Sequence, residues 1–186
     1  MWNLREEGDY GAELKSFTGY GDRRLHGLTG ALAKPKPVQL SLWSPAQIVP
    51  EDQSISGVRL SLIYGVNADV SGLDLGLVTK TTGNQVGASW AFVHLNEGDF
   101  LGYQDGLVNR VRGDFLGWKS GFVNLTGGKF SGLQTGFVNQ AGVLHGVQLG
   151  IWNSASSLDG ALQIGILNFN KSGKPHGFLP IVNWSF

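Results

Sequence analysis

Apolar and polar residues alternate with a period of two along most of the chain, and the whole pattern returns every 15 residues. The segments FLGYQDGLVN, FLGWKSGFVN and FSGLQTGFVN begin at Phe100, Phe115 and Phe130. Period-two alternation is typical of β-strands, and a short fixed repeat is typical of architectures in which each unit buries one side against its neighbours. The sequence therefore predicts an all-β repeat protein.

Ten repeat units can be aligned between residues 37 and 186, with one step of 20 residues, one of 14 and the rest of 15. The extra residues of the long step fall in segment 44–56, which we interpret as a loop leaving the stack because it contains Pro45, Pro50 and acidic residues. Residues 1–36 are irregular, and we expect them to be a cap over the first unit. The units begin at Pro37, Gly57, Gly72, Gly87, Gly102, Gly117, Gly132, Gly146, Ala161 and His176.

Equivalent positions of the units form columns of constant chemical character. The sixth column is apolar throughout, so we expect the second, fourth and sixth positions to face the core. The third column is mainly polar, with Arg59 and Asp74 as consecutive members, and the fifth is small in nine units. The eighth column is rich in asparagine, which tolerates a left-handed conformation and is expected to end each strand. Its asparagines are Asn109, Asn124, Asn139, Asn153, Asn168 and Asn183.

Two architectures fit these strands. In a β-solenoid each 15-residue unit is one coil, and equivalent residues stack in parallel about 4.8 Å apart. In an antiparallel up-and-down β-barrel of about ten strands, alternate connections would favour a rhythm of roughly 30 residues instead. The alternation of residues 178–186 towards a terminal aromatic residue is the main support for the barrel. We favour the solenoid, because only parallel stacking explains why Phe recurs over Phe and Asn over Asn.

Composition and charge restrict the classes of function. The chain has 186 residues, of which 41% are apolar, and this is enough for one domain with a core. Its net charge is zero, which gives no electrostatic support for binding nucleic acid. It has no cysteine, which excludes disulfides and thiolate metal sites. No apolar run is long enough for a membrane helix, and the charged first 30 residues do not form a recognisable signal peptide.

The middle units interrupt the apolar fourth column with polar residues. Asp105, Ser120 and Thr135 occupy it in three consecutive units, beside Tyr103 and Trp118 of the second column. Flat aromatic rings next to hydrogen-bonding groups can hold a sugar ring, and a carboxylate can orient its hydroxyl groups. These five residues are a candidate glycan-binding patch. The alternative interpretation is a hydrogen-bonded stack that relieves crowding between neighbouring rings.

The other motifs indicate no catalytic, cofactor or metal site. The histidines lack metal-ligand spacing, and the segment 127–129 lacks most of a phosphate-binding loop. The tripeptide Arg112-Gly113-Asp114 matches an integrin-recognition sequence, but ordinary turn chemistry explains it. A polysaccharide-cleaving enzyme would need convergent carboxylates, whereas Asp74 and Asp105 lie two units and one column apart. We therefore expect no enzyme and no cofactor.

The motifs resemble those of an uncharacterised family of bacterial surface-repeat proteins, of the GLQxGLVN type known from spirochaetes and other diderm bacteria. The resemblance is carried by Pro37–Trp43, Gly72–Val78, the GLQxGxVN copies and the closing Pro180–Phe186, and covers about residues 37–186. It implies export to the cell surface or outer membrane and implies no activity. A weaker similarity links the Gln-x-Gly-x-x-Asn element to the curli-subunit repeat, which is longer and pairs two strands per unit.

These observations predict a non-catalytic structural or adhesive cell-surface module that presents a rigid β surface to an unknown protein or glycan. One alternative is a small outer-membrane β-barrel, for which the membrane would be the partner. A second alternative is a carbohydrate-binding or carbohydrate-active β-helix protein. Open parallel ends would also predict end-to-end self-association unless both ends are capped.

Overall fold

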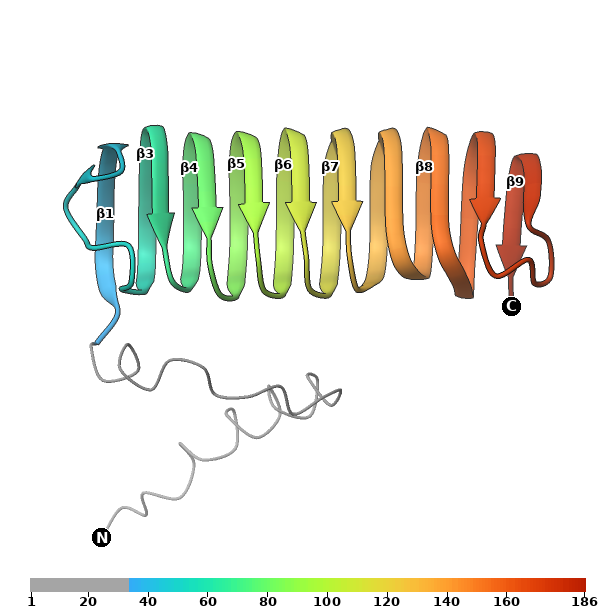
Figure 1. Cartoon of the computed structure of the whole chain (residues 1–186), viewed down its shortest axis with the longest axis horizontal. Helices are drawn as coiled ribbons and strands as arrows, with labels where there is room; N and C mark the ends of the chain where they lie inside the picture. The colour runs from blue at the N-terminus through green and yellow to red at the C-terminus, as the bar shows by residue number, and fades with distance from the viewer. Residues whose placement is uncertain (1–33) are drawn as a thin grey trace, which may run out of the picture. The chain divides into compact units, whose positions relative to one another are not determined.

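The computed structural model describes residues 34–186, and all regular structure in this range is β-strand. The strands form one nine-stranded sheet in the order β2-β1-β3-β4-β5-β6-β7-β8-β9, and Figure 1 shows them as successive coils of one winding. The expected cap over residues 1–36 lies, except for its last three residues, outside the described residues. The strands are β1 Lys36–Trp43, β2 Ala46–Gln47, β3 Ile55–Asn67, β4 Val70–Thr81, β5 Gln85–Asn96, β6 Phe100–Val111, β7 Phe115–Thr126, β8 Lys129–Asn170 and β9 Phe178–Ser185.

Neighbouring coils pair in parallel and in the register that the repeat predicts. Strand β1 is parallel to β3, and each strand from β3 to β7 is parallel to the next. Between β6 and β7, for example, Gly102 pairs with Gly117 and Asn109 with Asn124. Strand β8 continues around several bends over 42 residues without a break. The predicted β-solenoid is therefore confirmed, and the antiparallel alternative does not form.

The interior of the solenoid is largely polar, which reverses the expected orientation of the strands. The third-column residue Gln104 has 0% of its surface exposed, whereas the sixth-column residue Phe122 has 55% exposed. The prediction that the second, fourth and sixth positions face the core is therefore wrong. Period-two alternation distinguishes two faces of a strand but does not say which one is inside. Many polar residues can occupy the inside because they are hydrogen-bonded from one coil to the next, as Gln148 is to Gln134 at 2.8 Å.

Buried apolar residues come from a different position of the repeat. Phe100, Phe115 and Phe130 lie two positions before the first glycine of their units and are almost fully buried. Their rings stack with centroids 5.0 and 5.1 Å apart. This aromatic column and the apolar residues around it form the main hydrophobic cluster of the interior.

The asparagines of the eighth column are hydrogen-bonded to one another inside the solenoid. Asn109 donates from Nδ2 to Oδ1 of Asn124 at 2.9 Å, and Asn124 donates in the same way to Asn139 at 3.0 Å. The row continues through Asn153 to Asn168. These residues lie within strands and have negative φ, so the prediction that they end strands in a left-handed conformation is wrong. Their amides hold adjacent coils in register instead.

The fifth column is small because it faces these amides. A Cβ atom on Gly121 would collide with the carbonyl oxygen of Gly106 and with the amide nitrogen of Asn109. A Cβ atom on Gly136 would collide in the same way with the carbonyl oxygen of Gly121 and the amide nitrogen of Asn124. A larger residue would therefore push the coils apart.

The insertion 44–56 lies against the first coil rather than leaving the stack. Its β2 pairs antiparallel with β1, and Val49 is buried with Ile55 and Val70. Gln39 donates from Nε2 to the carbonyl oxygen of Val49 and accepts from its N–H, both at 2.9 Å. The side chain of Gln39, which would otherwise lie at the open end of its column, uses the insertion as its partner. This explains why a loop with several polar and proline residues is ordered.

The last strand reverses direction. Strand β9 pairs antiparallel with the end of β8, so that Asn183 lies opposite Gln163 and Ile181 lies opposite Gly165. The tenth unit, expected at His176, therefore does not continue the parallel register of the preceding units.

Candidate binding face

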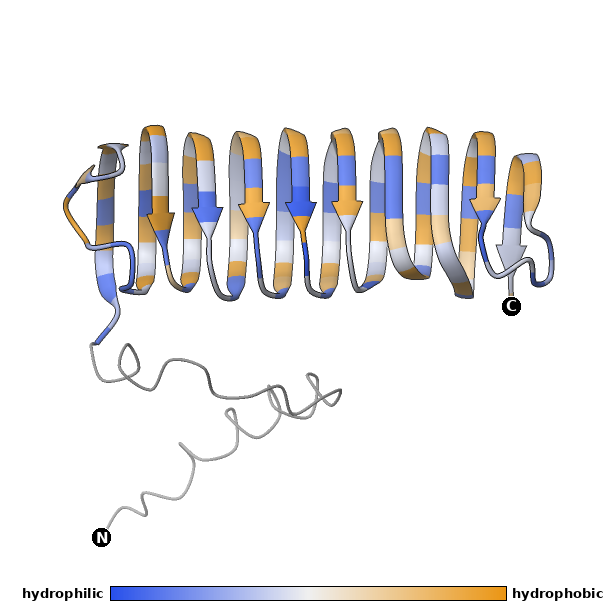
Figure 2. Ribbon diagram, viewed as in Figure 1, coloured by the Kyte–Doolittle hydropathy of each residue, from blue (hydrophilic) through white to orange (hydrophobic). Residues whose placement is uncertain are grey.

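The outside of the solenoid carries a continuous apolar ridge, defined here as the sixth-column side chains from Leu42 to Ile166. All nine of these side chains are exposed, over 37–60% of their surface. Figure 2 shows hydrophobic residues, in orange, along one bend of most coils. Eight steps of about 4.8 Å make it roughly 38 Å long. An apolar surface of this extent is typical of an interaction site. The ridge consists of Leu42, Leu62, Leu77, Phe92, Leu107, Phe122, Phe137, Ile151 and Ile166.

The opposite bend is polar and satisfies its own hydrogen bonds. Asp114 N–H donates to the carboxylate of Asp99 at 2.7 Å, and Lys129 N–H donates to the carboxylate of Asp114 at 2.7 Å. Arg112 pairs with Glu97 at 2.5 Å. The tripeptide at residues 112–114 therefore belongs to a regular row of turns. The cross-section is amphipathic, with one polar and one apolar bend.

The structure brings the five residues of the candidate glycan patch together on the outside of the sheet. Asp105, Ser120 and Thr135 occupy successive rungs of the fourth column. Tyr103 and Trp118 are paired two positions earlier, with ring centroids 5.2 Å apart, and Trp118 donates from Nε1 to Oγ1 of Thr135 at 3.4 Å. The three hydroxyl- or carboxylate-bearing side chains thus lie between aromatic rings on one side and the apolar ridge on the other.

Sequence reasoning missed Trp90 and Phe92. Trp90 is the rung before Asp105 in the fourth column, and its ring centroid lies 5.2 Å from that of Tyr103. Phe92 belongs to the apolar ridge, and the sixth column was assigned to the core. The signal that could have found Trp90 is its position, since it is the last apolar residue before the fourth column becomes polar.

A shallow groove of about 480 Å³ lies between the fourth and sixth columns in these coils. Its floor is formed by the small fifth-column residues, including Gly106 and Gly121. Trp90 and Asp105 line one side, and ridge residues, among them Phe92, line the other. The fifth column points inwards, towards the buried amides, so the outer surface between the fourth and sixth columns is formed there by backbone.

The carboxylate of Asp105 has free hydrogen-bonding capacity. Within residues 34–186 this carboxylate forms no ion pair and no side-chain hydrogen bond. Partial burial, and in second place the negative charge of Asp105, raise the pKa of the nearby Tyr103 hydroxyl. Tyr103 is therefore a neutral hydroxyl group at physiological pH.

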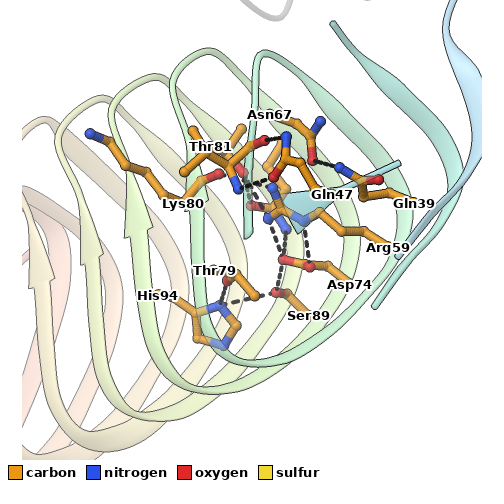
Figure 3. Close-up of polar contacts among 12 residues, drawn as sticks. Gln39, Gln47, Arg59, Asn67, Asp74, Thr79, Lys80, Thr81, Ser89 and His94 are labelled. Atoms are coloured by element: carbon orange, nitrogen blue, oxygen red, sulfur yellow. Dashed lines mark hydrogen bonds and ion pairs between the residues drawn. The ribbon is translucent and has the colours of Figure 1, made fainter. Parts of the chain in front are cut away.

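A second cluster of ionisable residues lies inside the coils (Figure 3). Arg59 and Asp74, both fully buried, form a two-pronged ion pair with two N–O distances of 2.7 Å. Two further guanidinium N–H groups donate to the carbonyl oxygen of Lys80 at 2.9 Å and to the hydroxyl of Thr81 at 3.0 Å. Burial raises the pKa of the Asp74 carboxyl, but the charge and hydrogen bonds of Arg59 outweigh it and hold the pKa below its usual value. The pair is ionised and closed to solvent.

His94 extends this cluster. Its Nε2 lies 3.0 Å from the carbonyl oxygen of Asp105, and its Nδ1 lies 3.0 Å from the hydroxyl of Thr79 and 3.1 Å from that of Ser89. Burial lowers the pKa of His94, and the charge of Asp74 opposes this only in part. The ring is therefore neutral, and it is a structural residue of the interior.

Lys119 is fully buried in the third column. Its Nζ donates to Oγ1 of Thr126 at 2.9 Å and to the carbonyl oxygen of Leu125 at 3.2 Å, and it lies 4.4 Å above the ring of Phe115. Burial lowers its pKa well below the usual value, and no carboxylate of the described chain pairs with it. This amine is enclosed and has no route to a substrate.

Neither a metal centre nor a spanning helix is found in the part of the chain that the structure describes. No group of three or more histidine, aspartate or glutamate side chains is arranged there to hold a metal ion. The same residues contain no helix that is long and apolar enough to cross a membrane.

The fold and the exposed face define a β-solenoid repeat module. No protein-family model, no curated protein and no solved structure matches the chain. The resemblance to bacterial surface-repeat proteins therefore rests on the sequence motifs alone.

Proposed function

We propose that this protein is a non-catalytic structural or adhesive module of the bacterial cell surface that presents the apolar ridge to a partner. The observation that carries the proposal is the ridge itself, in which nine consecutive coils each expose one large apolar side chain. Exposed apolar area costs about 25 cal/mol per Å² relative to burial. A surface of this length is best explained by a partner that covers it.

The interior supports a rigid rather than an adaptable surface. The hydrogen-bonded row from Asn109 to Asn168 joins five coils through side chains alone. A shift of one residue in any coil would leave buried amides without partners, at about 1–3 kcal/mol for each group. The ridge residues are therefore held at fixed spacing, which suits a scaffold or an adhesive surface.

The placement of the ionisable groups supports a non-catalytic role. Arg59, Asp74 and His94 converge inside the coils, and each is at most 1% exposed. No substrate reaches them without opening the coils. On the outside, Asp105 lies alone among apolar and hydroxyl-bearing side chains. A hydrolase would need a second acid or base close to it.

The proposal has two parts that can be tested separately. For location, intact cells of the source bacterium are treated with a membrane-impermeant biotinylation reagent, and labelling of the native protein before and after lysis is compared. We expect labelling before lysis. Labelling only after lysis would show that the protein does not act at the cell surface.

For the binding face, the full chain is incubated with outer-membrane fragments and with peptidoglycan sacculi of the same bacterium. The variant Leu107→Glu/Phe122→Glu places two charges on the ridge, and the control Thr82→Glu/Gln140→Glu places two charges elsewhere on the surface. We expect the ridge variant to bind about tenfold more weakly than wild type and the control to bind like wild type. Equal binding by all three proteins would exclude the ridge as the binding face.

A further inference from the structure

We propose that the groove beside Asp105 binds an uncharged, extended polysaccharide that runs along the solenoid axis. This inference rests on the proposed function, because it names the class of partner that the exposed face takes. It depends on three features of the groove: its two chemically different sides, its free carboxylate and its periodicity.

The two sides of the groove suit the two kinds of surface on a sugar ring. A pyranose ring has C–H faces that pack on apolar and aromatic surfaces, and a rim of hydroxyl groups that donate and accept hydrogen bonds. Phe92, Leu107 and Phe122 line one side with exposed apolar surface. Trp90, which is 42% exposed, adds an indole ring at one end of the other side. Aromatic rings of this kind contribute both contact area and orientation.

The polar side provides one hydrogen-bonding group, the carboxylate of Asp105, that the described chain does not use itself. The carboxylate of Asp105 forms no ion pair or side-chain hydrogen bond within the described chain, although it is partly buried between apolar neighbours. Its backbone is held by His94, which donates to its carbonyl oxygen at 3.0 Å. An ionised carboxylate accepts two or more hydrogen bonds, and hydroxyl donors of a sugar would supply them. The hydroxyls of Ser120 and Thr135 continue this side on the next two rungs.

The periodicity of the groove favours a polymer over a single sugar. Trp90, Asp105, Ser120 and Thr135 follow one another at single-rung steps, so they span about 14 Å along the axis. An extended polysaccharide presents the same hydroxyl edge and the same C–H face at regular intervals. A stack held in register by buried amides offers the matching regular series of contacts.

The charge of the groove selects against acidic glycans. Asp105 is the one charged residue among those that line it, and no lysine or arginine is present there to pair with a carboxylate, phosphate or sulfate group. An acidic chain would place like charges close together in a partly apolar surface, which is unfavourable. We therefore assign the site to uncharged chains.

The test uses the full chain and the uncharged probes cellohexaose, xylohexaose and chitohexaose, with hexagalacturonate as the acidic comparison. Binding is measured by calorimetry and by the fluorescence of the exposed tryptophans. We expect at least one uncharged probe to bind and hexagalacturonate to bind about tenfold more weakly or not at all. Preferential binding of hexagalacturonate would overturn the assignment.

Three variants locate the site. We expect Trp90→Ala and Asp105→Ala to weaken binding about tenfold each, because they remove the ring and the free acceptor. Trp152→Ala removes an exposed aromatic residue outside the groove and is expected to bind like wild type. Far-UV circular dichroism checks that each variant keeps its β structure. Equal affinity in all variants would show that the sugar binds elsewhere on the surface.

Failure of this inference is distinguishable from failure of the proposed function. If no uncharged probe binds at millimolar concentration, the polysaccharide assignment is wrong. If the ridge variant nevertheless loses binding to membrane fragments or sacculi, the proposed binding face stands and its partner is of another class. If no uncharged probe binds and the ridge variant binds membrane fragments and sacculi like wild type, both proposals are wrong.

Discussion

His94 donates the hydrogen of its Nε2 to the backbone carbonyl oxygen of Asp105, which lies in the next coil at 3.0 Å. A carbonyl oxygen only accepts, so the hydrogen of the neutral ring is on Nε2, and Nδ1 accepts from the hydroxyl of Thr79. The hydroxyl of Ser89 donates to Asp74 at 2.9 Å. His94 thus connects the buried hydroxyl of Thr79 to the backbone beneath the exposed groove.

This connection predicts how His94 can be replaced. His94→Leu leaves the carbonyl of Asp105 and the hydroxyl of Thr79 without partners, so we expect a loss of about 2–4 kcal/mol in the free energy of unfolding. His94→Asn restores the residue type of the eighth column, where Asn109 donates to the carbonyl oxygen of Ser120 in the equivalent bond. We expect it to lose less than half as much. Urea denaturation measures the free energy of unfolding of both variants. A loss of stability in His94→Asn as large as that in His94→Leu would contradict the assigned hydrogen bonds.

The buried histidine also predicts a dependence of stability on acid. Burial lowers the pKa of His94 in the folded state, so below the unfolded value of about 6.5 the unfolded chain binds a proton that the folded chain does not. Stability contributed by the neutral ring is complete above that pH and is lost as the pH falls below it. We expect His94→Asn to have a shallower loss of stability between pH 7 and pH 5 than wild type, measured by urea denaturation at each pH. Parallel curves for the two proteins would show that His94 is protonated in the folded state.

The buried Lys119 predicts a dependence of stability on pH in the alkaline range. Its folded-state pKa is lowered by burial, so between that value and about 10.4 the unfolded chain binds more protons and stability rises with pH. We expect Lys119→Met to be more stable than wild type by about 1–2 kcal/mol at pH 7, with the advantage shrinking towards pH 10. The exposed Lys129 gives a control, since Lys129→Met is expected to change stability by less than about 0.5 kcal/mol. A constant difference at all pH values would contradict a lowered pKa of Lys119 in the folded state.

The parallel register can be tested by disulfide trapping on the ridge. Phe122 and Phe137 are exposed and stacked, with ring centroids 4.9 Å apart, so their Cα atoms lie within disulfide range. We expect Phe122→Cys/Phe137→Cys to form an intramolecular disulfide quickly under mild oxidation. Phe122→Cys/Ile151→Cys separates the thiols by two rungs, about 10 Å, and is expected to react slowly. Equal rates in non-reducing electrophoresis would argue against the stack.

The fold class could be predicted from the sequence because a fixed offset has a direct geometric meaning. Residues 15 positions apart, such as Phe100 and Phe115 or Arg59 and Asp74, can recur or complement each other only if they become neighbours. That argument needs no knowledge of which side is buried. It therefore holds even though the orientation of the strands was predicted wrongly.

The orientation could not be read from the alternation of apolar and polar residues. Glutamine and asparagine usually face solvent, but in a parallel stack the amide of one coil satisfies the amide of the next, as Gln163 does with Gln148 at 2.8 Å. A stronger signal was available in the fifth column, because a run of glycine such as Gly106 and Gly121 is needed only where backbones approach closely.

The candidate site could be predicted only in part, because the sequence shows the chemistry of each column but not the space between columns. The polar interruption at Asp105, Ser120 and Thr135 identified the coils that carry the groove, because a change of chemistry within one column is visible in the sequence. The groove itself depends on space between the fourth and sixth columns, which no residue type indicates. Trp90 and Phe92 were therefore missed, although both line it.

Both outer strands of the sheet run antiparallel to their neighbours, β2 on β1 at one end and β9 on β8 at the other. A coil of a second molecule that docked on β2 or β9 would not continue the interior rows of glutamine and asparagine. The strand at each edge runs in the opposite direction to the coils that form these rows. In other proteins, exposed strand edges can template fibril growth. Here the two edge strands do not match the direction of the parallel repeat. Within residues 34–186 the parallel repeat is therefore bounded on both sides by an antiparallel strand, which disfavours end-to-end stacking of identical coils on these edges.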